Sequence, residues 1–319
     1  MLAPIFAFPY LSSLRRIRHL IHHLIFVSVL LPFPVLAMCK APLALQVLGS
    51  GGPIADDARA SSGYLLWVNG KSRLLIDAGG GTALRFGEAN GKFEDLEAVL
   101  LTHLHADHSA ELPALLKSSY FSKRKTPLPI LGPSGNKGWP STEEFIHGLF
   151  NSQTGIYRYL DGFMDGSDGM FKLEPKSADA TSREIHKLHT SEDITIYGVG
   201  VQHGPVPAIG YVIEINGKRI AFSGDQNNHN PAFTQLIKDA DLLVMTQAIP
   251  ENAGEIAQKL HATPSHIGKM AQEGKVQQLL LSHFMQRSLR VLDENKKLIQ
   301  THYKGKLAIA EDLACYDLL

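Results

Sequence analysis

The side chains that could do chemistry concentrate in one hexapeptide after the apolar segment Ala98–Leu101: His103-Leu104-His105-Ala106-Asp107-His108. Three imidazoles and a carboxylate beside a buried strand would leave several polar groups without hydrogen-bond partners, and a metal ion supplies those partners. Residues two apart in extended backbone project to the same side, so His103 and His105 can bind one ion. Asp107 and His108 then turn toward a second ion. Nitrogen and oxygen donors favour Zn²⁺, with Mn²⁺ or Fe²⁺ as alternatives.

Four residues farther along the chain carry side chains of the same two kinds, imidazole and carboxylate. His203, Asp225 and His283 each follow an apolar, strand-like segment, although each alone would more often be an ordinary residue. His261 precedes Ala262-Thr263-Pro264, where a histidine at a helix entry is the structural alternative to a catalytic role. The remaining candidates fit solvated faces or turns: His186, His189, His229 and His266.

Short apolar segments bounded by turn residues predict β-strands around these candidates. The predicted strands are Ala44–Leu48, Gly63–Val68, Ser72–Ile76, Glu97–Leu101, Ile194–Val201, Ile209–Ile215, Arg219–Ser223, Leu242–Thr246 and Val276–Ser282. Asn69-Gly70 and Asn216-Gly217 predict tight hairpins. Apolar periodicity predicts helices over 108–118, 231–240 and 264–273, and residues 133–195 are predicted as loops and short helices. Two runs of strands, each followed by helices, predict an α/β fold in a four-layer αβ/βα sandwich, with two facing mixed sheets and helices outside.

Composition restricts the class of protein. The chain has 319 residues, of which 44% are hydrophobic and 19% charged, so it can bury a sizeable core. The formal net charge of +0 argues against nonspecific electrostatic binding of nucleic acid. Two cysteines exclude a disulfide-rich scaffold and a Cys-only zinc site. In an oxidising compartment, Cys39 and Cys315 could pair.

Residues 1–37 have the pattern of a secretory signal peptide. Three arginines precede the apolar run Leu24–Leu31, and Val35-Leu36-Ala37 follows as a cleavage site. A membrane anchor is the alternative, and Met38 is a poor fit to a lipid-attachment site at Cys39. The remaining 38–319 are predicted to form one hydrolase domain with no stable membrane span, periplasmic or secreted. That part holds 28 basic and 31 acidic residues, a net charge of −3.

The hexapeptide resembles the signature of the metallo-β-lactamase superfamily, and the resemblance covers nearly all of 43–319. Four further segments are similar to the other motifs of that family: Leu74–Thr82, Val201–Tyr211, Ala221–Asp225 and Leu280–Phe284. Within the superfamily, the chain resembles the ribonuclease Z and arylsulfatase branch. The features that support this branch are the prolines after His203, Ser223-Gly224-Asp225, His261-Ala262-Thr263 and Leu281-Ser282-His283-Phe284.

The resemblance implies a role for each candidate. It assigns one metal to His103, His105 and His203, a second metal to Asp107, His108 and His283, and the bridging position to Asp225. Asp107 would also orient a hydroxide shared by the two metals. His261 would be the proton donor to the leaving group or an oxyanion stabiliser. Asp77 would fix an imidazole ligand from behind.

The chain departs from ribonuclease Z enzymes where those enzymes carry a long tRNA-gripping arm. His203 and Asp225 are only 22 positions apart, and two predicted strands fill the interval. Gln226 stands where that family usually has Thr, and Leu243–Ala248 lacks its usual His-Glu pair. These departures argue against processing of tRNA 3′ ends.

The resulting hypothesis is an exported dinuclear zinc hydrolase that cleaves a phosphodiester or sulfate ester of a small molecule through a metal-bridging hydroxide. A ribonuclease Z-type tRNA 3′-processing endonuclease is the alternative enzyme, and hydrolysis of C–O or C–N bonds, as in lactonases, is a third. A non-catalytic binding module on the same fold is the alternative from another class. A small-molecule ester is the expected partner, nucleic acid is not expected, and a homodimer is left open.

Overall fold

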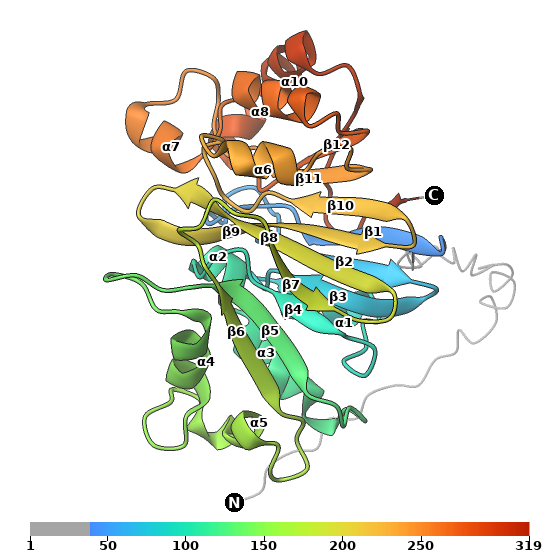
Figure 1. Cartoon of the computed structure of the whole chain (residues 1–319), viewed down its shortest axis with the longest axis vertical. Helices are drawn as coiled ribbons and strands as arrows, with labels where there is room; N and C mark the ends of the chain where they lie inside the picture. Colours follow the sequence, from blue (N-terminus) through green and yellow to red (C-terminus); the bar gives the residue numbers. More distant parts are fainter. Residues whose placement is uncertain (1–38, 319) are drawn as a thin grey trace, which may run out of the picture. The chain divides into compact units, whose positions relative to one another are not determined.

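Two seven-stranded sheets pack face to face and carry helices on their outer faces (Figure 1). The computed structural model describes residues 39–318. The predicted signal peptide, residues 1–37, lies outside these described residues. Within 39–318, no helix combines the length and apolarity needed to cross a membrane.

The first sheet has the strand order β14-β1-β2-β3-β4-β5-β6. Its strands are β1 (Leu43–Gly49), β2 (Gly63–Val68), β3 (Lys71–Ile76), β4 (Ala98–Leu100), β5 (Leu128–Pro133), β6 (Leu173–Ala178) and β14 (Cys315–Asp317). Pairing is antiparallel from β14 to β3 and parallel from β3 to β6, so the sheet is mixed.

The second sheet has the order β13-β12-β11-β10-β9-β8-β7. Its strands are β7 (His186–Thr190), β8 (Ile194–His203), β9 (Val206–Ile215), β10 (Lys218–Phe222), β11 (Leu242–Thr246), β12 (Gln278–Ser282) and β13 (Lys306–Ile309). The hairpin strands β7 to β10 pair antiparallel, and β10 to β13 pair parallel. Both predicted Asn-Gly hairpins are confirmed, at Asn69-Gly70 and Asn216-Gly217.

Alternating side chains on each strand build the layers, because successive residues of a strand point to opposite faces. In β3, Leu74 and Ile76 pack between the sheets, whereas Leu75 packs against the helices outside. In β11, Leu242 and Val244 face the other sheet, whereas Leu243 packs outward. The four-layer αβ/βα sandwich predicted from the sequence is therefore confirmed.

Helices cover both outer faces (Figure 1). Beside the first sheet lie α1 (Thr82–Glu88), α3 (Leu112–Ser118), α4 (Thr142–Phe150) and α5 (Gly162–Asp165). Beside the second sheet lie α6 (Pro231–Leu236), α8 (Pro264–Glu273) and α10 (Leu292–His302). The short helices α2 (Ala106–Ser109), α7 (Glu255–Leu260) and α9 (Gln286–Leu289) lie in connections, as do two 3₁₀ turns, Ser119–Phe121 and Arg158–Leu160.

Three predictions of local structure need correction. The helix predicted over 108–118 is split into α2 and α3, since α3 starts afresh with Pro113 in its first turn. Proline lacks the backbone N–H that a continuous helix would require there. Residues 133–195 contain the edge strands β6 and β7 as well as loops and helices. Helix α6 also ends at Leu236, earlier than predicted.

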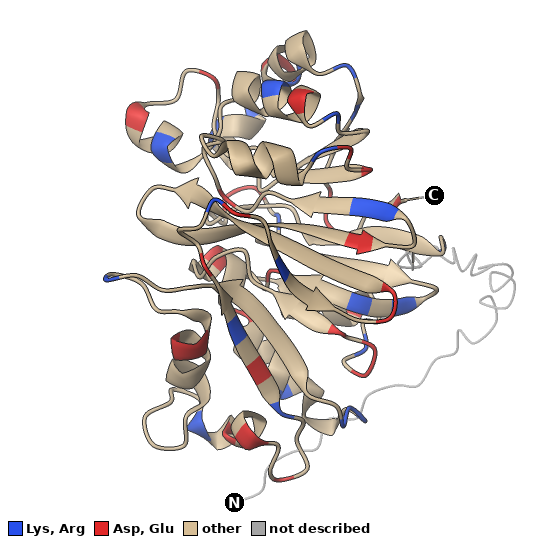
Figure 2. Cartoon of the chain, viewed as in Figure 1, with Lys and Arg blue, Asp and Glu red and all other residues tan. Residues whose placement is uncertain are grey.

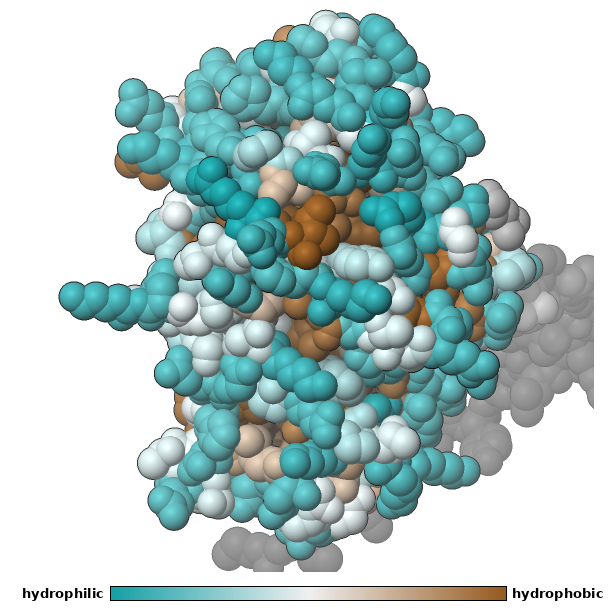
Figure 3. Space-filling model, in the orientation of Figure 1, coloured by the Kyte–Doolittle hydropathy of each residue, from teal (hydrophilic) through white to brown (hydrophobic). Residues whose placement is uncertain are grey.

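A disulfide joins Cys39, just before β1, to Cys315 in β14, with their Cα atoms 5.6 Å apart. Strand β14 pairs with β1 in the same region, so the ends of the described chain meet at one edge of the first sheet. The pairing that the sequence left open is therefore present. In Figure 2, acidic and basic residues are interspersed along the ribbon, and the face in Figure 3 is mostly hydrophilic.

Candidate active site

The candidate ligands sit where strands of both sheets end. His103 follows β4, His203 is the last residue of β8, Asp225 follows β10 and His283 follows β12. In the connection after β4, His105 is the cap of α2, which carries Asp107 and His108. Strand ends from two facing sheets thus bring side chains from four distant parts of the sequence to one edge of the sandwich.

The structure brings together the two ligand sets that the resemblance implied. Nitrogen atoms of His103, His105 and His203 form one group. Ligand atoms of Asp107, His108 and His283 form another. Within each group, the atoms lie within 4.8 Å of one another. In the first group, His105 Nδ1 lies 3.0 Å from His103 Nε2 and 3.4 Å from His203 Nε2. In the second, His283 Nε2 lies 3.2 Å from Asp107 Oδ2.

Asp225 lies between the two groups. Its Oδ1 is 3.7 Å from His108 Nε2, and its Oδ2 is 3.3 Å from His283 Nε2 and 3.8 Å from His203 Nε2. The carboxylate is 2% exposed, and Thr246 Oγ1 donates a hydrogen bond to Oδ1 at 3.0 Å. This central position is the one that a bridging carboxylate needs.

Neighbouring groups orient the imidazoles. The carbonyl oxygen of Leu260 lies 2.8 Å from His203 Nδ1, which directs Nε2 of that ring toward the cluster. Asp77 does the same for His108, whose Nδ1 is 2.8 Å from Oδ2 of Asp77. Asp77 thus takes the place that the resemblance implied.

Burial keeps three of the imidazoles neutral. It lowers the pKa of His103 well below its ordinary value and also lowers the pKa values of His105 and His203. Metal ligation requires neutral imidazole. Burial opposes charge on His108 too, but surrounding carboxylates outweigh it and raise its pKa to about 10. Those carboxylates belong to Asp77, Asp225 and Asp107.

An unsatisfied buried atom supports a metal-binding role for the cluster. Within the cluster, His108 Nε2 is buried and has no hydrogen-bond partner among the described residues. Such atoms are costly to bury unless something binds them. For His108 the unpaired nitrogen faces the carboxylates of Asp107 and Asp225, so divalent cations fit the donor set.

His261 also lies at the cluster. It follows α7 directly, is 7% exposed, and its Nδ1 is 3.7 Å from Asp225 Oδ2 without a hydrogen-bond partner. Burial lowers its pKa to about 3, although Asp225 acts in the opposite direction. A neutral imidazole here can donate an N–H, and the atoms of His203, Asp225 and His261 also form a third potential ligand group.

Two residues near the site were not predicted from the sequence. Trp139, in the connection between β5 and α4, has its ring 5.2 Å from that of His105. Thr102 donates to Asp77 through its backbone N–H at 2.7 Å and its hydroxyl at 2.9 Å. The position of Thr102 between an apolar strand and the hexapeptide was a usable signal, whereas nothing in the sequence connects Trp139 with His105.

The weaker histidine candidates lie elsewhere. His186 and His189 belong to β7, and His189 Nε2 is 3.2 Å from Glu97 Oε1, so it is part of an ion-pair network and not of a free solvated face. The rings of His229 and His266 lie 5.8 Å apart and are absent from the ligand groups.

Residues 72–284 match the family model described as "Beta-lactamase superfamily domain", and this segment contains all seven candidate ligands. The chain belongs to the beta-lactamase superfamily. Proteins with this fold typically bind divalent metals, which agrees with the groups of histidine and aspartate seen here.

Curated relatives in the superfamily include enzymes named Ribonuclease Z. The one from Mycobacterium bovis is 29% identical over 291 residues, covering 85% of this chain and 96% of the relative. The one from Methanosarcina mazei is 26% identical over 304 residues, with the same coverage of 85% and 96%. These relatives support the ribonuclease Z branch and make the expectation that nucleic acid is not a partner doubtful.

Solved structures show the same superfamily fold. The metallo-beta-lactamase fold protein YhfI from Bacillus subtilis has a TM-score of 0.66 at 22% identity, covering 87% of this chain and 99% of that one. Human tRNase Z, short form, has a TM-score of 0.66 at 21% identity, covering 86% and 99%. At this identity the likeness supports the fold.

Proposed function

We propose that the chain is a dinuclear metal-dependent phosphodiesterase that hydrolyses RNA. The observation that carries the proposal is the convergence of two ligand groups on the buried carboxylate of Asp225. The relatives named Ribonuclease Z favour RNA over the small-molecule phosphodiester or sulfate ester expected from the sequence. RNA therefore replaces a small-molecule ester as the preferred substrate class.

The seven candidate ligands would hold two divalent ions, preferably Zn²⁺. His103, His105 and His203 would hold one ion, Asp107, His108 and His283 the other, and Asp225 would contact both. When bound, such a pair of cations supplies Lewis acidity and lowers the pKa of a water molecule. In hydrolysis, the water oxygen forms a bond to phosphorus, the bond from phosphorus to the ester oxygen breaks, and that oxygen takes up a proton.

The residues of the chain have distinct tasks in this reaction. The Asp107 carboxylate, whose side chain is 9% exposed, would orient the attacking water while also contacting a metal. The proton-donor role that the resemblance implied for His261 is disfavoured by the low pKa of its imidazole. As a neutral imidazole, His261 would donate a hydrogen bond to the developing negative charge. Its place beside Asp225, at 3.7 Å, and its unpaired Nδ1 support this role.

The RNA that fits this site need not be tRNA. Strand β8 ends at His203 and β9 begins at Val206, and β9 and β10 are joined by the Asn216-Gly217 turn. No arm therefore rises between His203 and Asp225. We expect single-stranded RNA to be cleaved at least as well as a tRNA precursor.

We also propose that the protein is exported. The Cys39–Cys315 disulfide supports this location, because such bonds persist in oxidising compartments. The amino terminus of the protein recovered from a periplasmic fraction tests it, and a start near residue 38 is expected. Recovery only in the cytosol, with residue 1 retained, would overturn export.

A substrate panel tests the catalytic proposal. Residues 38–319, loaded with zinc or manganese, are assayed with an unstructured oligoribonucleotide, a tRNA precursor with a 3′ extension, bis(p-nitrophenyl) phosphate and p-nitrophenyl sulfate. We expect cleavage of the oligoribonucleotide and of the phosphodiester, its loss on chelation and its return with added metal. Turnover of the sulfate alone, or of nothing in a protein shown to hold two metals, would refute the proposal.

A further inference from the structure

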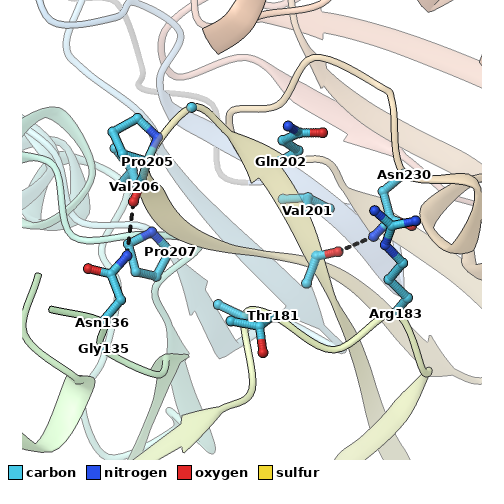
Figure 4. A pocket seen from close by; sticks show the side chains of 13 residues that line it. Gly135, Asn136, Thr181, Arg183, Val201, Gln202, Pro205, Val206, Pro207 and Asn230 are labelled. Atoms are coloured by element: carbon cyan, nitrogen blue, oxygen red, sulfur yellow. Dashed lines mark hydrogen bonds between the residues drawn. The ribbon is translucent and has the colours of Figure 1, made fainter. Parts of the chain in front are cut away.

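A cavity of about 260 Å³ lies beside the turn between β8 and β9, where Gly204 and Pro205 line it (Figure 4). Its walls come from parts of the chain that are far apart: residues 135–136 after β5, residues 180–183 after β6, the end of the β8–β9 hairpin, and Asn230. None of the candidate metal ligands lines it. The cavity is thus separate from the ligand cluster but shares the hairpin with it.

The cavity is cationic. Arg183 is its single charged lining residue, and no carboxylate lines it. Among residues 39–318, the Arg183 guanidinium has no ion-pair or hydrogen-bond partner. The carboxylate of Asp179 accepts a hydrogen bond from the Thr181 hydroxyl at 2.7 Å. Neighbouring residues of a strand point to opposite faces. Because His203 points to the ligand cluster, Gln202 points to the cavity, which it lines.

The amides of the walls are already engaged. Asn136 Nδ2 donates to the carbonyl oxygen of Pro205 at 3.0 Å, which joins two walls (Figure 4). Asn230 Nδ2 donates to the carbonyl oxygen of Gly200, and its Oδ1 accepts from the backbone of Ala232 at 3.0 Å. These bonds hold the cavity open and leave the side chains of Arg183 and Gln202 for a ligand. A guanidinium and an amide, with no carboxylate among the lining residues, are suited to an anion, above all to phosphate.

One tight turn connects the cavity with the ligand cluster. Asn136 and Trp139 exchange backbone hydrogen bonds of 2.9 and 3.2 Å, so Asn136 lines the cavity while the Trp139 ring lies beside His105. An RNA strand that crosses this turn would pass an aromatic ring, on which bases stack. Its next phosphate would then reach the guanidinium on the other side.

We propose that the cavity binds a phosphate of the RNA adjacent to the scissile one, with Arg183 as the residue that binds it. This inference rests on the proposed function. Arg183 is then a specificity-determining residue and takes no part in the bond-breaking step. Substrates with a single phosphate do not need it.

The test compares Arg183→Glu and Arg183→Lys with Arg158→Glu, an equally exposed arginine outside the cavity. All are zinc-loaded, and each is assayed with an oligoribonucleotide, with bis(p-nitrophenyl) phosphate, and for binding of a labelled phosphorothioate oligoribonucleotide. We expect Arg183→Glu to weaken RNA binding and raise KM by about tenfold or more, with kcat unchanged and a shallower salt dependence. Arg183→Lys should retain most of the affinity, and all variants should turn over the single-phosphate substrate normally.

Each other result has a distinct meaning. Unchanged RNA binding in Arg183→Glu, or an equal loss in Arg158→Glu, overturns the cavity inference and leaves the proposed function standing. Loss of bis(p-nitrophenyl) phosphate turnover in Arg183→Glu also overturns it, because the residue would then be structural. If the unaltered protein binds RNA through Arg183 but hydrolyses neither substrate, the proposed function fails, and of the cavity inference only the binding of an RNA phosphate by Arg183 survives.

Discussion

Asp77 Oδ2 lies 2.8 Å from His108 Nδ1, and both side chains are almost fully buried. The contact occupies one ring nitrogen and presents the other, Nε2, to Asp107 and Asp225. Backbone and hydroxyl groups of Thr102 hold the same carboxylate from the far side. Asp77 thus sets the direction of His108 without facing the reacting atoms.

Asp77→Asn should weaken metal binding by about 10–100-fold, as is typical when the partner of a ligating histidine is altered. Asparagine is the appropriate replacement because Asp77 has a φ of 58°, a conformation that Asn tolerates. Zinc affinity measured by competition with a chelator checks this. An unchanged affinity in a folded variant would show that Asp77 does not support the site.

His105→Ala should abolish turnover and weaken metal binding, because its Nδ1 lies within 3.4 Å of both His103 and His203 nitrogens. His266→Ala is the matched control, since His266 lies on the exposed side of α8. Metal content and phosphodiester turnover are measured for both. Full activity in the His105 variant would contradict the ligand assignment.

His261→Ala should retain both metals and slow turnover by about 10²–10³-fold, the range for loss of one hydrogen-bond donor to the developing negative charge. His261 could instead be a metal ligand, because its ring lies with His203 and Asp225 in a third potential ligand group. Loss of a metal ion from the variant would identify His261 as a ligand instead.

Breaking the disulfide should lower the free energy of unfolding by about 2–5 kcal/mol, because the bond closes a long loop in the unfolded chain. The loop spans 276 residues in sequence. Urea unfolding of Cys39→Ser/Cys315→Ser and of the unaltered protein, each with and without reductant, checks this. Reductant should destabilise only the unaltered protein, and equal stability of all four samples would mean that the bond is absent in solution.

Glu97 should make the protein sensitive to acid. Burial favours its neutral form, but the hydrogen bond with His189 and the ion pair with Arg73 outweigh burial and lower its pKa from 4.5 to about 2. The stabilisation is therefore fully present above about pH 4.5 and is lost as pH falls toward 2. When urea unfolding is measured between pH 6 and pH 3.5, the free energy of unfolding should fall less with pH in Glu97→Gln than in the unaltered protein.

The ligand cluster could be predicted from the sequence because its members follow apolar strands. The sequence of segments such as Leu280–Ser282 predicts buried strands, and polar residues directly after them must lie where the strands of the sheet end. Histidine and aspartate at four such ends leave few chemical explanations. The layers were predictable for the same reason, since Leu74, Leu75 and Ile76 alternate between two cores.

The edge strands could not be predicted in the same way. Strands β6 and β7 lie at the edges of their sheets and carry polar residues, and β6 contains Pro175. Proline is tolerated at an edge but argues against a strand in a sequence reading. The approach of Trp139 to His105 depends on how a loop folds back across the sheet end, which no local pattern specifies.

The bond between Cys39 and Cys315 turns the described fold into a covalent ring. The exposed turn at 136–138 divides the candidate ligands, with His103, His105, Asp107 and His108 before it and His203, Asp225 and His283 after it. A protease that cuts this turn in the oxidised protein opens the ring but releases no fragment. Both halves of the ligand set stay attached to one molecule until a reductant separates them.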